Sequence, residues 1–404
     1  MAKINKMIKK IIPYIDKIIE YMLYLLVFFI PTSISGINIF SGLLFIIYVI
    51  RLVLKQDQTI WKGKFNKLIL LFAVFSLFSV LWANDRYRAL SFFISPVLKY
   101  VLIYYLIINY INTKTKFYKI FVAYWSSHII SGGYAIYRNF VVGIRRVDGF
   151  THNPNRLGSI MMMFIIINFA ILLYTNRKNL KIGVFSIIGI IVGTLALFAS
   201  SSRGALLGLI AGLFIVALLK GKKFLIYLLI GLILLSLFMP SYYKNRISKL
   251  TDITSNNVYS RLSMYKAGFD MFKEKPILGI GLNNVRTVYD MYDLPEFEHF
   301  GNEHRNLHNL YINILVELGA IGFGILIYLI FVLGKKAWLN YKINKNWFTL
   351  GIIGLFVGEG THNLFDYTFH ASEVFMIVLV FIGLLMVNEE IDLKIKEGMI
   401  SYEN

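Results

Sequence analysis

The 404-residue chain contains no cysteine and few charged residues. Without thiols it has no disulfide, no thiolate nucleophile and no cysteine-ligated metal. Aspartate, glutamate, lysine and arginine together make up 16% of the residues, against the ~25% that is typical of soluble domains. Hydrophobic residues make up 57%, and the mean hydropathy is +0.64. So few ionic groups could not cover the surface of a soluble protein, and the composition predicts a membrane protein.

The hydrophobic residues form runs of about 16–25 positions, the length that a helix needs to cross a hydrocarbon layer of ~30 Å. The alternating ten-residue segments of a membrane β-barrel are absent. We therefore predict an all-α, polytopic membrane protein with about 12 transmembrane helices, in a single membrane domain over residues 1–404. The expected spans are 19–35, 37–54, 68–83, 91–109, 117–142, 157–174, 182–199, 204–219, 224–240, 309–334, 347–363 and 372–388.

The basic residues set the expected orientation. They concentrate at the N-terminus and in alternate inter-span segments, so the positive-inside rule predicts a multi-pass protein of the bacterial inner (cytoplasmic) membrane with both termini cytoplasmic. The long polar segment 241–308 is then an external loop on the periplasmic face. Within it, Tyr259–Phe272 has the spacing of an amphipathic helix that lies against the membrane. The first apolar run, Tyr21–Ile30, lacks a following small-residue cleavage site and is predicted to be an uncleaved helix.

Arginine and lysine are distributed differently across this topology. Of 13 arginines, 11 fall on the predicted outer side, whereas 23 of 29 lysines fall inside. A guanidinium group binds phosphate or carboxylate with two parallel hydrogen bonds. The outer side is therefore predicted to hold an anionic ligand, with lipid headgroup contacts and ordinary ion pairs as the alternative. The net charge of +20 follows from topology, and we expect no nucleic-acid partner because no such motif is present.

Arg203 is the strongest individual candidate for this ligand. It lies in Ser200-Ser-Ser-Arg-Gly-Ala205 between two expected spans, with no other charge from Lys181 to Lys220. A charge at such a place is costly unless it is paired or faces a polar cavity. An arginine that merely extends its head to the interface is the alternative.

Histidines mark the end of the external loop. Glu303-His-Arg-Asn-Leu-His-Asn309 places His304 and His308 at i and i+4 of a possible helix. This spacing could suit a metal, but no Glu-x-x-His or similar pattern supplies further ligands, and we predict neither a metal nor any other cofactor. An imidazole beside outward arginines is better suited to accept a proton from a hydroxyl; a structural hydrogen-bonding role is the alternative.

A further polar cluster suggests a different class of function. Glu359, His362 and Asp366 share one face near the outer end of an expected span. An intramembrane glutamate is compatible with an ion-coupled membrane transporter. However, these groups lie toward one side of the membrane, whereas transporter sites lie near its middle, and no inverted repeat is visible.

Four short motifs resemble the O-antigen ligase and O-antigen polymerase superfamily. They are Gly149-Phe-Thr-His-Asn-Pro-Asn-Arg156, Ser202-Arg-Gly-Ala205, the stretch from Arg261 to Pro276-Ile-Leu-Gly-Ile-Gly281, and His308-Asn-Leu-Tyr-x5-Glu317-Leu-Gly319 followed by Gly322. The resemblance covers about residues 145–325. It implies a C-type glycosyltransferase-like membrane fold that acts on the outer face of the inner membrane and uses an undecaprenyl diphosphate-linked glycan as donor.

The resemblance also implies roles for individual residues. Arg203 and Arg261 would bind the donor diphosphate, with Arg286 as a third contact, and His308 would be the catalytic residue that orients or deprotonates the acceptor. The supporting residues are Glu317, Asn309, Arg156, His304 and His362. Such enzymes need no metal, because arginine neutralises the leaving group, and direct attack on the anomeric carbon would invert it.

The acceptor separates the two activities of the superfamily. A ligase transfers the glycan to lipid A-core or another cell-surface glycan acceptor, whereas an O-antigen or capsule-type polymerase uses lipid-linked repeat units. Polymerases often have two substantial external loops. Here 143–156 is short and only 241–308 is long, which favours the ligase.

Overall fold

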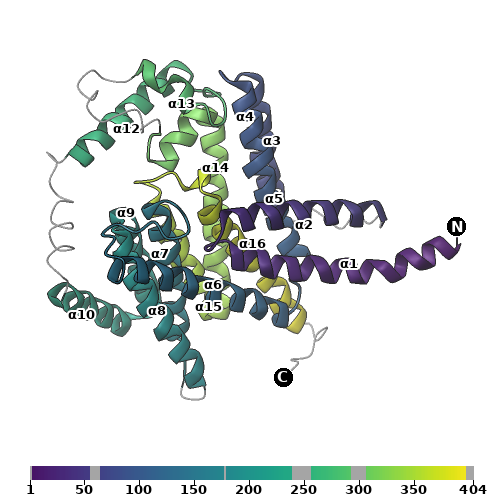
Figure 1. Cartoon of the computed structure of the whole chain (residues 1–404), viewed down its shortest axis with the longest axis horizontal. Helices are drawn as coiled ribbons and strands as arrows, with labels where there is room; N and C mark the ends of the chain where they lie inside the picture. Colours follow the sequence, from purple (N-terminus) through teal and green to yellow (C-terminus); the bar gives the residue numbers. More distant parts are fainter. Residues whose placement is uncertain (1, 55–63, 177–178, 239–255, 293–305, 397–404) are drawn as a thin grey trace.

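The computed structural model describes residues 2–54, 64–176, 179–238, 256–292 and 306–396, and within these residues the secondary structure is helical. Figure 1 shows the helices as an assembly whose members run in several directions. The α-helices are α1 Ala2–Phe29, α2 Ile34–Leu54, α3 Lys64–Phe78, α4 Arg86–Phe92, α5 Leu98–Tyr110, α6 Lys114–Phe140, α7 Pro154–Leu172, α8 Leu180–Ser200, α9 Arg203–Lys220, α10 Lys222–Phe238, α12 Asn256–Glu274, α13 Val285–Val288, α14 Leu310–Asn344, α15 Trp347–His362 and α16 Ser372–Lys396.

Six helical segments of the described chain are long and apolar enough to cross a membrane. They are Ile34–Leu54, Arg86–Tyr110, Pro154–Leu172, Leu180–Ser200, Arg203–Lys220 and Leu310–Asn344. Phe65–Leu81 and Ser372–Asn388 are shorter apolar helices. The prediction of an all-helical membrane protein is therefore confirmed. The count of twelve spans, the single-domain assignment and the position of the termini stay predictions.

The helix pair α9 and α15 forms the closest packing near the site. A Cβ added to Gly208 would lie 2.5 Å from the carbonyl oxygen of Gly358, and one added to Gly354 would lie 3.1 Å from that of Gly212. Small residues at four-residue spacing allow the backbones of membrane helices to approach this closely. The pairing brings the first residues of α9 beside the last turn of α15. α7 packs against the same pair and is buried along most of its length.

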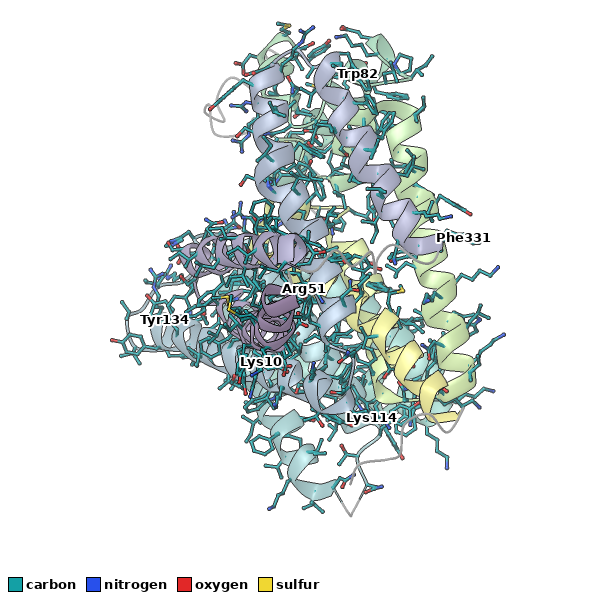
Figure 2. The ribbon with its side chains drawn as sticks, turned by 90° about the vertical axis from the view of Figure 1, so that its right-hand side faces the viewer. Lys10, Arg51, Trp82, Lys114, Tyr134 and Phe331 are labelled. Atoms are coloured by element: carbon teal, nitrogen blue, oxygen red, sulfur yellow. The ribbon has the colours of Figure 1, made fainter. Side chains whose placement is uncertain are left out.

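The first two helices lie apart from this group. α1 and α2 run side by side, crosswise to α3 and α14 (Figure 1). Arg51 joins them, because its Nε donates a hydrogen bond to Oδ1 of Asp16 at 2.8 Å (Figure 2 labels Arg51). The helix of the first expected span starts well before residue 19 and ends at Phe29, ahead of Pro31, which cannot continue a hydrogen-bonded helix.

Helix α14 is broken at Gly319, whose φ of 64° and ψ of −171° are not helical. The turn after Pro276 satisfies the backbone groups that this break exposes. The amides of Ile280 and Gly281 donate to the carbonyls of Val316 and Glu317 at 3.0 and 2.9 Å, and the amide of Ala320 donates to Pro276 at 2.8 Å. Unpaired backbone groups are costly in the membrane. The apolar Pro276–Gly281 motif therefore completes the broken helix.

The described part of the 241–308 segment contains α12, α13 and this turn. The amphipathic helix predicted over Tyr259–Phe272 is confirmed as α12. Its inner face carries Met264, Ala267 and Met271, which are buried in a small apolar cluster with Ile312 of α14. Leu262 and Phe269 are exposed on the other side of the helix. The external position of the segment stays a prediction.

Candidate functional site

Several helices begin or end at one place. α7, α9 and α14 start there, and their first turns are capped by the side chains of Asn153, Ser202 and Asn309. α15 ends there, and the amide of Leu310 donates to the carbonyl of Asn363 at 3.0 Å. The positive ends of three helix dipoles therefore converge on the turn after α15, which makes this region suited to an anion.

His308 and Asp366 face one another across this junction. His308 Nδ1 lies 3.5 Å from Oδ1 of Asp366. His308 precedes α14 and has a φ of 44°, so it does not lie on a helix as the sequence predicted. His304 itself lies outside the described residues. An imidazole oriented by a carboxylate is the arrangement of a general base and its partner.

The Asp366 carboxyl is held in its charged form. Burial acts to raise its pKa, but the hydrogen bond with His308, the charges of His362 and His308 and the amide of Tyr367 together lower that pKa far below its ordinary value. The amide of Tyr367 donates to Oδ1 of Asp366 at 2.8 Å. A carboxylate that stays ionised beside an imidazole stabilises the imidazolium form, which is the form that His308 takes after it accepts a proton.

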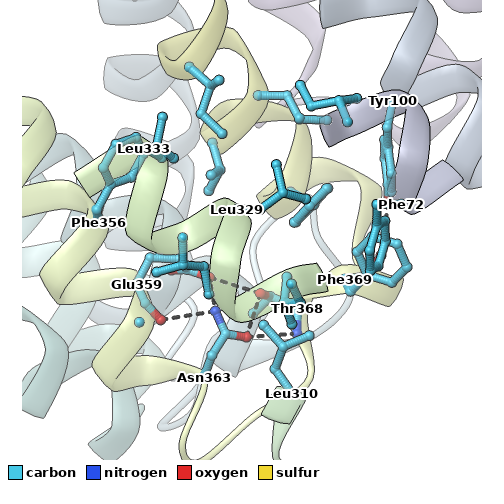
Figure 3. Close-up of a pocket in the computed structure, with 18 of the residues that line it drawn as sticks. Phe72, Tyr100, Leu310, Leu329, Leu333, Phe356, Glu359, Asn363, Thr368 and Phe369 are labelled. Carbon is cyan, nitrogen blue, oxygen red and sulfur yellow. Dashed lines mark hydrogen bonds between the residues drawn. The ribbon is translucent and has the colours of Figure 1, made fainter. Parts of the chain in front are cut away.

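A buried network around Glu359 fixes the turn that carries Asp366. Ser159 donates to Oε2 of Glu359 at 2.6 Å. Thr368 and Asn363 donate to Oε1 at 2.9 and 3.0 Å (Figure 3). His362 Nδ1 lies 3.9 Å from Oε2. The Glu359 carboxylate is thus saturated with donors, which is how a buried charge is tolerated. The expected cluster is confirmed for Glu359 and His362 on α15, whereas Asp366 lies beyond the end of that helix.

The start of α9, which carries Arg203, and the side chain of Arg261 approach the same residue. Arg203 is the first residue of α9, and a Cβ on the next residue, Gly204, would lie 3.3 Å from Cβ of Phe365. The guanidinium of Arg261, on α12, lies 5.8 Å from the ring centroid of Phe365. Tyr265, one turn further along α12, donates to the carbonyl of Leu364 at 2.7 Å. The start of α9 and the Arg261 guanidinium therefore lie beside the turn that carries Asp366.

Arg286 and Arg156 lie on a different side of the turn. Burial and the positive charges of Arg286, Arg156 and Arg88 lower the pKa of His370 to about 3. Arg286 also acts electrostatically on Glu317, which accepts a hydrogen bond from the Tyr367 hydroxyl at 3.2 Å. Arg156 Nη1 donates to Oε1 of the buried Glu373 at 2.8 Å. The predicted arginines thus form two groups rather than one.

The supporting residues have structural contacts at the junction. Asn309 caps α14, since its side-chain oxygen accepts from the amide of Ile312, and its Nδ2 donates to the carbonyl of Leu364 at 3.0 Å. Glu317 lies next to the break in α14 and is buried. Both residues therefore hold the 363–371 turn against the start of α14.

Left-handed backbone conformations gather at the junction. The described non-glycine residues with positive φ are His152, Ser201, Asn283, His308 and Lys345, and all but Lys345 fall in or beside the motifs that carry the family resemblance. Such conformations cost about 1–3 kcal/mol each and concentrate at functional sites. Within the described residues, the motifs thus coincide with most of the left-handed non-glycine backbone.

Sequence reasoning missed the partners of these residues. Asp366 was recognised as a member of a polar face but not as the partner of His308, and Ser159, Thr368 and Tyr367 were not singled out. The only local signal at these positions is a hydroxyl group among apolar residues. Their contacts could not be predicted, because they join α7, α14 and the 363–371 turn, which are far apart in sequence.

One comparison with known proteins finds a family match over part of the chain. Residues 188–327 match the family model described as O-antigen ligase, which supports the predicted superfamily. No curated protein matches the chain. The matched region contains Arg203, Arg261, Arg286, His308 and Glu317, whereas Asp366 lies beyond it.

Proposed function

We propose that this chain, whose residues 188–327 match the O-antigen ligase family, transfers a glycan from undecaprenyl diphosphate to a hydroxyl of lipid A-core or another cell-surface acceptor on the outer face of the inner membrane. The observation that carries the proposal is the pairing of His308 with Asp366 on a turn that Arg261 and the start of α9 approach. This arrangement places a base close to positively charged groups that can stabilise the departing diphosphate.

The donor diphosphate would lie between the N-terminus of α9 and α12. Arg203 and Arg261 supply forked hydrogen-bond donors, and the helix dipole of α9 adds partial positive charge. As the bond between the anomeric carbon and the diphosphate breaks, its electron pair goes to the phosphate oxygen. Positive groups fixed in place before the reaction stabilise this developing charge without a reorganisation cost.

His308 would accept the proton of the attacking hydroxyl. Its Nδ1 faces Asp366, so Nε2 would be the atom that accepts the proton of the acceptor hydroxyl. The acceptor oxygen forms the new bond to the anomeric carbon while its proton passes to Nε2, and Asp366 stabilises the imidazolium. A single displacement of this kind inverts the anomeric centre.

The buried polar residues would position these groups. Glu359 fixes Thr368 and Asn363, His362 lies beside Glu359, and Asn309 joins the turn to α14. Since the 363–371 turn carries Asp366, changes in these residues would act on the reaction through the orientation of the His308 imidazole.

A polysaccharide polymerase acting on lipid-linked repeat units is the second candidate, because its chemistry is the same. The packing of the 143–156 segment against its neighbours favours the ligase. Arg138 pairs with Asp148 at 2.5 Å, and Tyr134 stacks on Phe150 with ring centroids 4.3 Å apart. This segment is thus held against α6 and offers no second large loop.

Reconstitution in liposomes tests the proposal. Purified protein is supplied with a lipid-linked glycan and with lipid A-core, and the products are separated by size. Transfer to lipid A-core is expected for the wild type and for the control Arg145→Gln, an exposed arginine, whereas Arg203→Ala and Arg261→Ala should be impaired. A ladder of repeat units formed without lipid A-core would instead establish the polymerase. Equal activity of all variants would contradict the donor site.

A further inference from the structure

One aromatic residue, Phe365, links the separate parts of the candidate site. It precedes Asp366 on the turn after α15, and its amide donates to the carbonyl of His362 at 2.9 Å. A Cβ added to Gly204, at the start of α9, would lie 3.3 Å from Cβ of Phe365. The guanidinium carbon of Arg261, on α12, lies 5.8 Å from the centroid of the Phe365 ring. Phe365 therefore lies against both α9 and α12 and adjoins Asp366.

The backbone of α12 is fixed over this turn independently of the arginine. The Tyr265 hydroxyl donates to the carbonyl of Leu364 at 2.7 Å, and the inner face of the helix is buried in its own apolar cluster. Arg261 precedes Tyr265 by four residues, so both side chains extend from one face of α12 toward the same turn. The docking of α12 therefore sets where the Arg261 side chain begins, but it does not set where the guanidinium lies.

The Phe365 ring supplies the contact that holds this guanidinium. A long arginine side chain loses much conformational entropy when it is fixed. Within the described part of the chain no carboxylate pairs with Arg261, and its guanidinium lies over the Phe365 ring. A cation within ~6 Å of a ring centroid is attracted by the electron-rich face of the ring. Both side chains are half-buried, so the attraction is stronger than it would be in bulk water.

The contact with the ring is compatible with phosphate binding. The hydrogen-bond donors of a guanidinium lie in its plane, whereas an aromatic ring attracts its face. A diphosphate can therefore bind the N–H groups of Arg261 while the ring contact persists. The first turn of α9, whose amides carry partial positive charge, lies against Cβ of the same phenylalanine. Both positive groups can thus meet one anion.

We propose that Phe365 is a positioning residue of the donor site, which holds the Arg261 guanidinium beside the N-terminus of α9 so that both meet the donor diphosphate. Fixing the arginine in advance reduces the entropy that is lost when the diphosphate binds. The inference rests on the proposed function and adds a residue outside the 188–327 family match. Because Asp366 follows Phe365 directly, one turn positions both the donor-binding arginine and the partner of the base.

Fluorination of the Phe365 ring tests the proposal, because fluorine withdraws electron density from the ring face while the shape of the ring changes little. Phenylalanine with one, two or three fluorine atoms is incorporated at position 365 of the full chain, and binding of geranylgeranyl diphosphate is titrated. The affinity should fall with each added fluorine, by ~3–10-fold in total. The same series at Phe269, an exposed phenylalanine of α12, is the matched control and should leave the affinity unchanged.

Arg261→Gln separates this inference from the proposed donor site. It should weaken binding of the probe, and in its background fluorination at position 365 should have no further effect, because the cation is absent. Probe binding by Arg261→Gln as tight as that of the wild type would show that the donor site itself is wrong. Weak binding by Arg261→Gln together with an unchanged affinity across the fluorinated series would leave the donor site standing and overturn the role of Phe365. An affinity that rises with fluorination would also overturn it, because the ring would then compete with the phosphate for the guanidinium.

Discussion

His308 Nδ1 lies 3.5 Å from Asp366 Oδ1, although one residue precedes α14 and the other follows α15. The contact depends on the hydrogen bonds that join the start of α14 to the turn after α15, among them Asn309 to Leu364 and Leu310 to Asn363. The pair gives the proposed base its orientation.

Asp366→Asn should lower the turnover rate by on the order of 100-fold or more, because the amide cannot stabilise an imidazolium. Binding of the lipid-linked donor should change little, since Arg203 and Arg261 are unaltered. Single-turnover rates and donor affinity, measured on the same preparation, separate the two effects. Loss of donor binding with an unchanged rate would place Asp366 in the donor site instead.

Arg203→Lys should not restore the activity that Arg203→Ala loses. A lysine keeps the charge but replaces the planar fork with a point charge, and hydrogen bonds to charged groups contribute about 1.5–3 kcal/mol. We expect kcat/KM to fall by about 10–100-fold in both variants. A lysine variant with wild-type kcat/KM would show that charge alone is required.

Gly319→Ala should destabilise the protein by about 3 kcal/mol or more. Its φ of 64° and ψ of −171° favour glycine, and a Cβ would collide with the carbonyl of Ile277. Gly324→Ala, on the same helix with free space around its Cβ, should be neutral or stabilise slightly. Thermal unfolding in detergent compares the pair, and equal unfolding temperatures would contradict the break in α14.

His370→Phe should make the protein less sensitive to acid. The pKa of His370 is lowered to about 3 by burial and by Arg286, Arg156 and Arg88. Between pH 6.5 and 3 the unfolded chain therefore binds a proton that the folded chain does not, and wild-type stability falls as the pH falls, by at most ~1.4 kcal/mol per pH unit. Phenylalanine keeps the contact with Phe92 but cannot titrate.

The measurement is the unfolding temperature of both proteins from pH 7 to pH 4.5. The wild type should lose stability more steeply than His370→Phe, whereas His152→Gln, which changes an exposed histidine, should follow the wild type. Parallel curves for wild type and His370→Phe would show that His370 does not titrate in this way.

Parts of the fold were predictable because local chemistry determines them. The expected spans 204–219 and 347–363 agree closely with α9 and α15, where capping side chains, Ser202 and Asn346, mark the starts of long apolar runs. The motifs also predicted a common site for His308, Arg203 and Arg261, and the segments that carry these residues do approach the 363–371 turn.

Other features depend on tertiary contacts and could not be predicted. The break at Gly319 lies inside a continuous apolar run, and only pairing with Pro276–Gly281 makes it stable. Likewise, nothing local distinguishes Arg286 from Arg261. Their separation into two groups follows from docking of α13 on α4 and of α12 on the 363–371 turn.

In the proposed mechanism His308 removes the proton of the acceptor hydroxyl. The decisive measurement compares glycan transfer from the lipid-linked donor by His308→Ala to a hydroxyl acceptor and to azide, because azide attacks without losing a proton. We expect transfer to the hydroxyl to fall at least ~100-fold, while transfer to azide stays close to that of the wild type. Hydroxyl transfer at the wild-type rate by His308→Ala would contradict the account.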